Sequence, residues 1–149
     1  MKGFDARKRS VLALAIVLIA ATVYYFFVAQ GSPSMRFSKE DRTFAFFGPK
    51  NTFVQFSFDE LTRLELYDSG DPDWGEPVAG GEVLGGNRWG IWRSDSLGEY
   101  HAFVAKRIPA FILVSDGEEN AIFNQDNRET TVSLYQQMLA FKNGELESR

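Results

Sequence analysis

The sequence predicts a mainly β domain that is closed by one C-terminal α-helix and preceded by one transmembrane helix. Three observations support this fold class. The 18 residues from Val11 to Val28 contain no charged side chain, which is typical of a membrane span. Short apolar stretches separated by turn residues, several of them alternating with period two, fill most of residues 42–125, as in a series of β-strands. From residue 126 the apolar positions recur with the helical period instead.

Residues 11–30 have the length and composition of a single-pass anchor. At a rise of about 1.5 Å per residue they extend over about 30 Å, which is one hydrocarbon core. A cleaved signal peptide is one alternative, but its apolar region is shorter and ends in small residues. Here the run ends in the bulky residues Tyr24–Phe27. A buried helix of a soluble protein is the other alternative.

Basic residues before the anchor predict its orientation. Lys2, Arg7, Lys8 and Arg9 precede the span, and Lys and Arg resist translocation. We therefore expect a plasma-membrane protein with a cytoplasmic N-terminus and an extracytoplasmic C-terminal domain. The expected organisation is a cytoplasmic basic segment 1–10, a transmembrane helix 11–30, a juxtamembrane linker 31–41, a folded domain 42–143 and a tail 144–149.

About seven short strands are expected in the domain. The first three are expected to form a meander, with a compact turn at residues 48–51, and Asp116–Gly117 marks a later hairpin. Residues 68–87 show no periodicity and read as a long loop, either functional or mobile. The expected strands cover residues 43–47, 52–58, 61–67, 88–92, 100–106, 110–114 and 121–123.

The C-terminal helix has a start signal, an apolar face and a stop signal. Asp126 followed by Glu129 has the spacing of a capping box, and Gly144 lies just past the end. The residues expected on one face are Thr131, Val132, Tyr135, Met138, Leu139 and Lys142.

Several segments resemble the bacterial pleckstrin-homology-like domains. These are Gly90–Arg93, Leu97–Phe103 and Ala110–Gly117, followed by the helix start at Asp126 and Glu129, with Phe58–Leu66 resembling a strand corner. The resemblance spans Arg42 to Phe141. It implies a PH-like split β-barrel of about seven strands capped by one helix, often joined to a membrane span, and it implies no particular activity.

Charge and composition exclude several classes of function. Beyond residue 30 there are 12 Lys/Arg and 19 Asp/Glu, a net charge of −7, which disfavours nucleic acid and anionic lipid as partners. The loop that would bind phosphoinositides, residues 48–51, offers only Lys50, so we do not expect the phosphoinositide binding of related domains here. The chain has no cysteine and only one histidine, His101. We expect no enzyme activity and no cofactor.

The acidic stretch 68–76 and the nearby tryptophans are the candidate site. Alternation places Trp89 and Ile91 on one face of a strand and Gly90 and Trp92 on the other, so that one tryptophan is core and one is exposed. The candidate partner-binding residues are Trp74, Trp92, Asp71 and Asp73. A calcium site is the alternative, although the D-x-D-x-D-G spacing is not met; its candidate ligands are Asp68, Asp71, Asp73 and Glu76.

The sequence therefore favours a membrane-anchored binding or scaffolding module. Residues 11–30 would contact the lipid bilayer, and the exported domain would bind a membrane or exported protein. The alternative is a domain that senses a ligand or an ion such as calcium through residues 68–76.

Overall fold

The computed structural model describes residues 16–19, 34–48, 52–69, 72–83 and 86–145. The chain divides into two units, Met1–Ser32 and Pro33–Arg149. In the first unit only residues 16–19 are described, and they are helical. None of the described helices has the length and apolar character needed to span a bilayer. The expected anchor, residues 11–30, falls outside the described residues except for these four.

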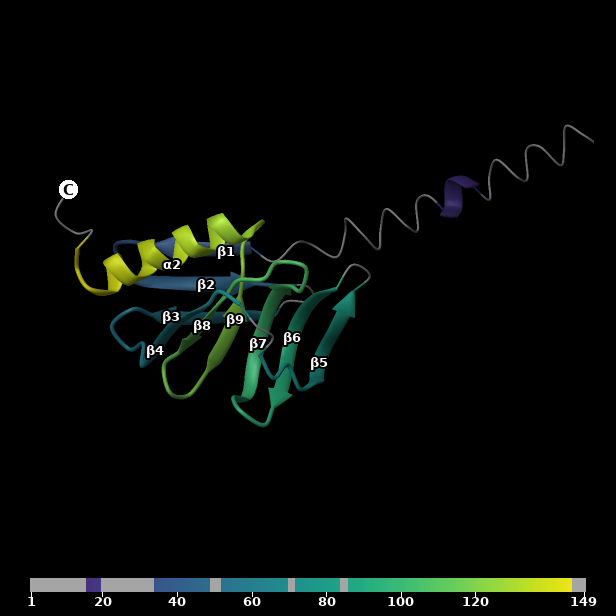
Figure 1. The fold of residues 1–149 in the computed structure, drawn as a ribbon, viewed down its shortest axis with the longest axis horizontal. Helices are drawn as coiled ribbons and strands as arrows, with labels where there is room; N and C mark the ends of the chain where they lie inside the picture. The colour runs from purple at the N-terminus through teal and green to yellow at the C-terminus, as the bar shows by residue number, and fades with distance from the viewer. Residues whose placement is uncertain (1–15, 20–33, 49–51, 70–71, 84–85, 146–149) are drawn as a thin grey trace, which may run out of the picture. The chain divides into compact units, whose positions relative to one another are not determined.

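The second unit is mainly β with a C-terminal helix, as the sequence predicted. Its described residues form nine strands in two sheets (Figure 1). The smaller sheet has the order β1-β2-β3 and the larger one β4-β8-β9-β7-β6-β5. The elements are β1 (Ser34–Ser38), β2 (Thr43–Phe47), β3 (Phe53–Ser57), β4 (Arg63–Tyr67), β5 (Glu76–Val83), β6 (Asn87–Ser94), β7 (Gly98–Ala105), β8 (Phe111–Ser115), β9 (Asn120–Phe123) and α2 (Arg128–Lys142).

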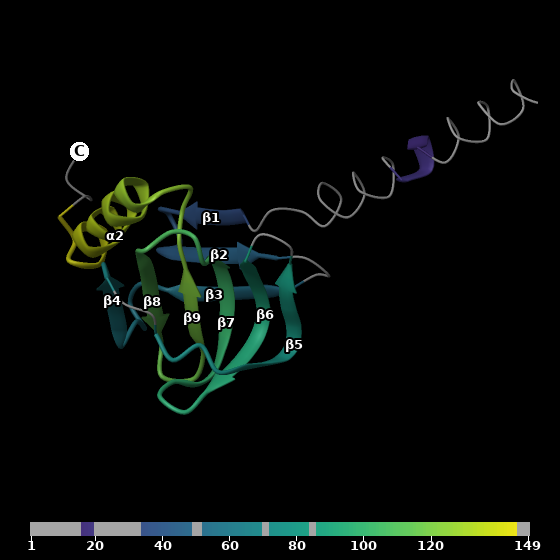
Figure 2. The ribbon, with the colours of Figure 1, turned by 45° about the vertical axis from the view of Figure 1, so that its right-hand side comes forward.

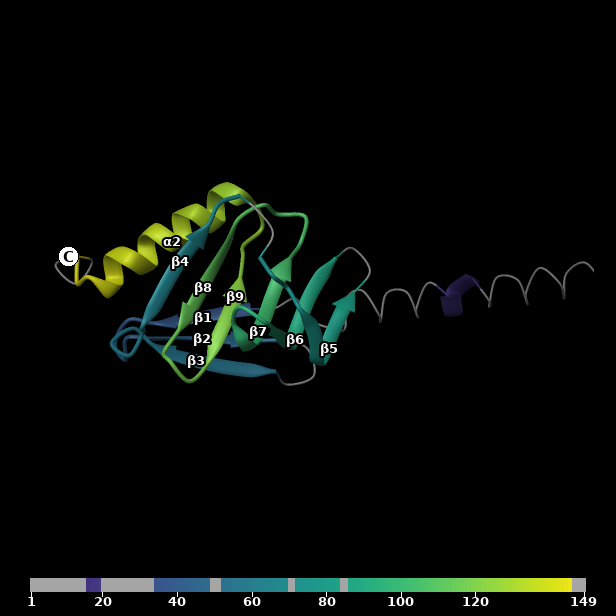
Figure 3. The ribbon, with the colours of Figure 1, turned by 60° about the horizontal axis from the view of Figure 1, so that its bottom comes forward.

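The strands of the two sheets run across one another (Figure 2). Helix α2 lies along β4 and β8, at the end of the larger sheet that is opposite to β5 (Figure 3). The larger sheet is open, with β4 and β5 as its two edges. Its pairing is mixed, because β9 returns from the hairpin with β8 and lies parallel to β7. The two sheets do not form one closed barrel.

All seven expected strands are present, but two others were missed. β1 lies in the expected linker 31–41, and β5 lies in the expected loop 68–87. The third expected strand is β4, which pairs with β8 rather than continuing the meander after β3. The meander consists of β1, β2 and β3 instead. β1 is held partly by Phe37, whose ring contacts those of Phe58 and Phe141.

Two apolar clusters lie on opposite faces of the larger sheet. The first fills the space between the two sheets and α2, with the phenylalanines of β2 and β3 at its centre. The second lies on the other face, around Trp92 and Tyr100. β8 contributes to both, since Ile112 and Val114 belong to the first cluster and Phe111 and Leu113 to the second. A strand buried on both faces reads as a continuous apolar run.

The helix cap differs from the expected one by a single residue. The N-cap is Asn127 rather than Asp126, because the Asn127 side chain accepts the backbone N–H of Thr130 and the Thr130 hydroxyl accepts that of Asn127. This is a capping box in which Thr130 takes the place expected for Glu129. Gly144 ends the helix with φ of 76°, as predicted.

Candidate functional site

The connecting segment, residues 68–75, joins the two opposite edges of the larger sheet. Trp74 from this segment lies over the second apolar cluster, where its ring centroid is 5.4 Å from that of Phe111 on β8. The Tyr67 ring, at the end of β4, stacks on Phe111 from 5.0 Å. Trp74 therefore covers apolar side chains on this face of the sheet that would otherwise meet water.

Trp92 belongs to the core. Its side chain is 3% exposed, and its indole N–H donates to the backbone oxygen of Trp89 at 3.2 Å. The guanidinium of Arg88 lies 4.7 Å from the ring centroids of both Trp74 and Trp92, which is a cation–π arrangement on two sides. The predicted alternation along β6 is confirmed, since Gly90 and Trp92 share the buried face. The expected exposed patch that includes Trp92 is wrong, because this face of β6 is covered by the connecting segment.

Two hydrogen-bonding groups fix the connecting segment. The hydroxyl of Tyr100 donates to the backbone oxygen of Trp74 at 2.6 Å. Burial raises the pKa of Tyr100 to about 12, and the nearby charge of Arg88 opposes part of this rise. A carboxylate oxygen of Asp73 accepts the backbone N–H groups of Asp95 at 3.0 Å and Ser96 at 3.4 Å. Asp73 therefore ties the segment to the turn between β6 and β7.

The three candidate calcium ligands that the structure describes, Asp68, Asp73 and Glu76, do not form one metal site. Asp68 forms an ion pair with Arg128 at the start of α2, and Asp73 binds backbone amides as described above. Glu76 begins β5, and Asp71 lies outside the described residues. No group of three or more Asp, Glu or His side chains that could hold a metal ion is found among the residues described.

The feature that sequence reasoning missed is the exposure of β5. Residues 76–80 and Glu82 are exposed, and the Val78 side chain is 50% exposed. Among the described strands β5 pairs with β6 alone. An edge strand directs about half of its backbone N–H and C=O groups away from the sheet. No other described strand pairs with these groups of β5.

A close approach of two glycines holds β5 to β6. Gly80 and Gly90 face each other across the ladder, with positive φ of 130° and 92°. A Cβ atom on Gly80 would lie 2.3 Å from the backbone oxygen of Trp89, and one on Gly90 would lie 2.2 Å from that of Ala79. Glycine within a strand marks such approaches, and this was the one sequence signal that could have revealed β5.

The opposite edge of the sheet, β4, is protected in ways that β5 is not. Arg63 and Glu65 form a bidentate pair at 2.9 and 3.0 Å on β4. This pairing raises the pKa of Arg63 and lowers that of Glu65. Helix α2 also packs against β4. Edge strands are protected by charged side chains, covering elements, proline and β-bulges. β5 has Pro77 and a bulge between Pro77 and Ala79, but its residues 77–81 carry no charge.

Comparisons with protein-family models, with curated proteins and with solved structures found no match to this chain.

Proposed function

We propose that this protein is a membrane-anchored binding module that captures an extended segment of a partner protein along β5. The observation that carries the proposal is β5 itself, an eight-residue edge strand that is exposed on both faces and paired on one side. In this mode of recognition the partner adds a strand to the sheet, and backbone hydrogen bonds supply the affinity.

The energetics of β5 favour this assignment. Ordering the backbone costs about 1–2 kcal/mol per residue, and an ordinary strand offsets this cost by burying apolar side chains. The exposed side chains of β5 contribute little of this kind. A second strand on its outer edge would pair the remaining backbone groups and cover part of Val78. Binding would therefore add to β5 the second neighbour that it lacks among the described strands.

The anchor and the finer fold remain part of the proposal. Residues 11–30 would span the plasma membrane and place the domain on the extracytoplasmic side, where a membrane or exported protein would be the partner. A PH-like split barrel is supported by the β1–β3 meander, by the closing helix α2, and by the resemblance carried by Gly90–Arg93 and Ala110–Gly117. The proposed role is binding rather than catalysis.

Two matched glycine variants test the proposal. Gly80→Val introduces a side chain where a Cβ meets backbone at 2.3 Å, whereas a Cβ on Gly81 meets nothing within 4 Å. The full-length protein is captured from its native membrane in mild detergent, and partners are identified by mass spectrometry. A partner retained by the wild type and by Gly81→Val, and lost by Gly80→Val, is the expected result. A partner retained equally by all three proteins would place the binding surface away from β5.

A further inference from the structure

A recess of about 580 Å³ adjoins the start of β5. The connecting segment and β5 line one side of it, and the end of β6 with the following turn lines the other. It contains three carboxylates, those of Asp73, Glu76 and Asp95. Its one cationic side chain, Arg93, is paired with Glu99 on β7. The recess is therefore acidic, and it is continuous with the free edge because Glu76, Pro77 and Val78 belong to both.

From this continuity we propose that the strand accepted by β5 carries a Lys or Arg side chain that enters the recess. This inference rests on the proposed function, since it requires strand addition at β5. A long cationic side chain on the added strand can reach past the edge to the carboxylates, which accept hydrogen bonds from ammonium or guanidinium groups. The backbone of β5 would give affinity and the recess would give selectivity.

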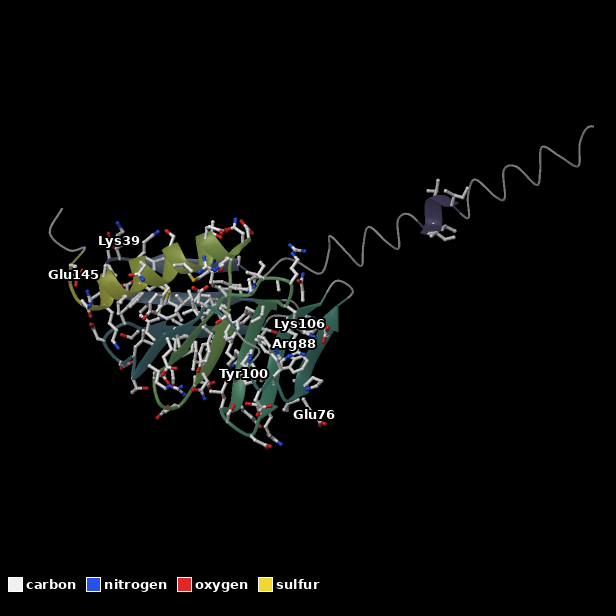
Figure 4. All side chains as sticks on the ribbon, viewed as in Figure 1. Lys39, Glu76, Arg88, Tyr100, Lys106 and Glu145 are labelled. Carbon is white, nitrogen blue, oxygen red and sulfur yellow. The ribbon has the colours of Figure 1, made fainter. Side chains whose placement is uncertain are left out.

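The two ends of β5 differ in charge, which sets the end of β5 at which the basic residue of the partner would lie. Glu82 lies 3.5 Å from both the Arg88 Nε and the Lys106 Nζ, so its charge is already balanced. Glu76 forms no ion pair with any residue that the structure describes. Figure 4 shows Arg88 and Lys106 near one end of β5 and Glu76 near the other. The cationic residue of the partner would therefore lie at the Glu76 end.

A second copy of the chain fits the edge less well. An antiparallel, two-fold pairing centred on Ala79 would place Glu76 opposite Glu82 in both copies. Like charges directly opposite one another destabilise a strand pair. Each copy also carries a net charge of −7 beyond residue 30. A basic segment of another protein removes both objections, because its charge is complementary to the edge and to the domain.

The test selects peptides from a random nine-residue library on the full-length protein in detergent, with Gly80→Val used for counter-selection. We expect the enriched peptides to carry Lys or Arg at a fixed position near one end. Replacing that residue by Gln should weaken binding about fivefold at low salt, as expected for a partly exposed ion pair. The double variant Glu76→Gln/Asp95→Asn should have the same effect on the original peptide.

A control for the loss of a carboxylate elsewhere uses Glu60, an exposed residue in the turn that leads to β4, and β4 is the edge of the sheet opposite to β5. Glu60→Gln should leave peptide binding unchanged. Peptides that require β5 but show no preference for basic residues would overturn this inference while the proposed function stands. A dimer of the chain that Gly80→Val dissociates would overturn the choice of partner. Absence of any enrichment over Gly80→Val would contradict the proposed function, and this inference with it.

Discussion

β8 and β5 belong to the same sheet, but different interactions hold each of them in place. All five residues of β8 are buried, and its side chains pack into both apolar clusters. β5 is longer, yet Glu76–Gly80 and Glu82 are exposed and the strand has one neighbour. β8 is therefore held by its side chains, whereas β5 is held by its backbone ladder and by two glycines. The comparison shows that a strand can be well formed without contributing to the core, and it is such a strand that we propose to serve binding.

The largest difference in the free energy of unfolding is expected between a variant that truncates a core tryptophan and one that truncates a valine of β5. Trp92→Ala removes a buried side chain and one of the two rings that flank Arg88, and should lower the free energy of unfolding by about 3–5 kcal/mol. Val78→Ala removes a half-exposed side chain and should change it by less than about 0.5 kcal/mol. Urea titration of the full-length protein measures both. Similar losses for the two variants would show that β5 is part of the core.

The paired glycine variants probe how β5 is attached. Gly80→Val combines a positive φ with a backbone clash, so we expect β5 to detach from β6 at a cost of about 1–2 kcal/mol. Gly81→Val should be neutral within about 0.5 kcal/mol. Urea titration gives the stabilities. Equal stability of the two variants would show that the approach of Gly80 to Gly90 is not required.

The Tyr100 hydroxyl, which binds the connecting segment, should make the stability of the fold depend on pH. The pKa of Tyr100 is raised to about 12 in the folded state, against about 10 when unfolded. The neutral phenol therefore stabilises the fold below pH 10, and this contribution falls as the pH rises toward 12. By pH 11 the loss should be roughly 1 kcal/mol. Thermal unfolding between pH 8 and 11 measures it, and Tyr100→Phe should lack that part of the decline. An identical decline in the variant would contradict the assignment.

Addition of calcium should have the smallest effect on the stability of the protein. Asp68 and Asp73 are engaged with Arg128 and with backbone amides, so we expect millimolar calcium to leave the melting temperature of the full-length protein unchanged. An equal concentration of magnesium is the control. A rise of several degrees with calcium alone would restore the sensing alternative based on residues 68–76.

Side-chain patterns predicted the fold where side chains determine it. The apolar runs in β2 and β8 and the alternation in β3 and β6 are visible in the sequence because burial selects those residues. β5 was missed because Pro77, Gly80 and Gly81 are residues that disfavour strands, and its geometry depends on backbone approach. The helix cap was predicted at Asp126 and lies at Asn127. Assignments of helix ends commonly differ by one or two residues.

The site proposed here overlaps the one predicted from the sequence in location more than in composition. The region around residues 68–76 does adjoin the proposed binding edge, and Asp73 and Glu76 do line the recess. Trp92 was misassigned because alternation along β6 identifies two faces without saying which one is covered. The connecting segment covers the Trp92 face, and that contact between distant parts of the chain is not readable from local pattern.

Amide hydrogen exchange on the full-length protein tests the central claim most directly. If the outer edge of β5 is open, about half of its amides should exchange rapidly in the free protein, while those of β8 exchange slowly. Adding a peptide selected from the library should protect the fast amides of β5 and leave β8 unchanged. Amides of β5 that are already as protected as those of β8 before any peptide is added would contradict the account.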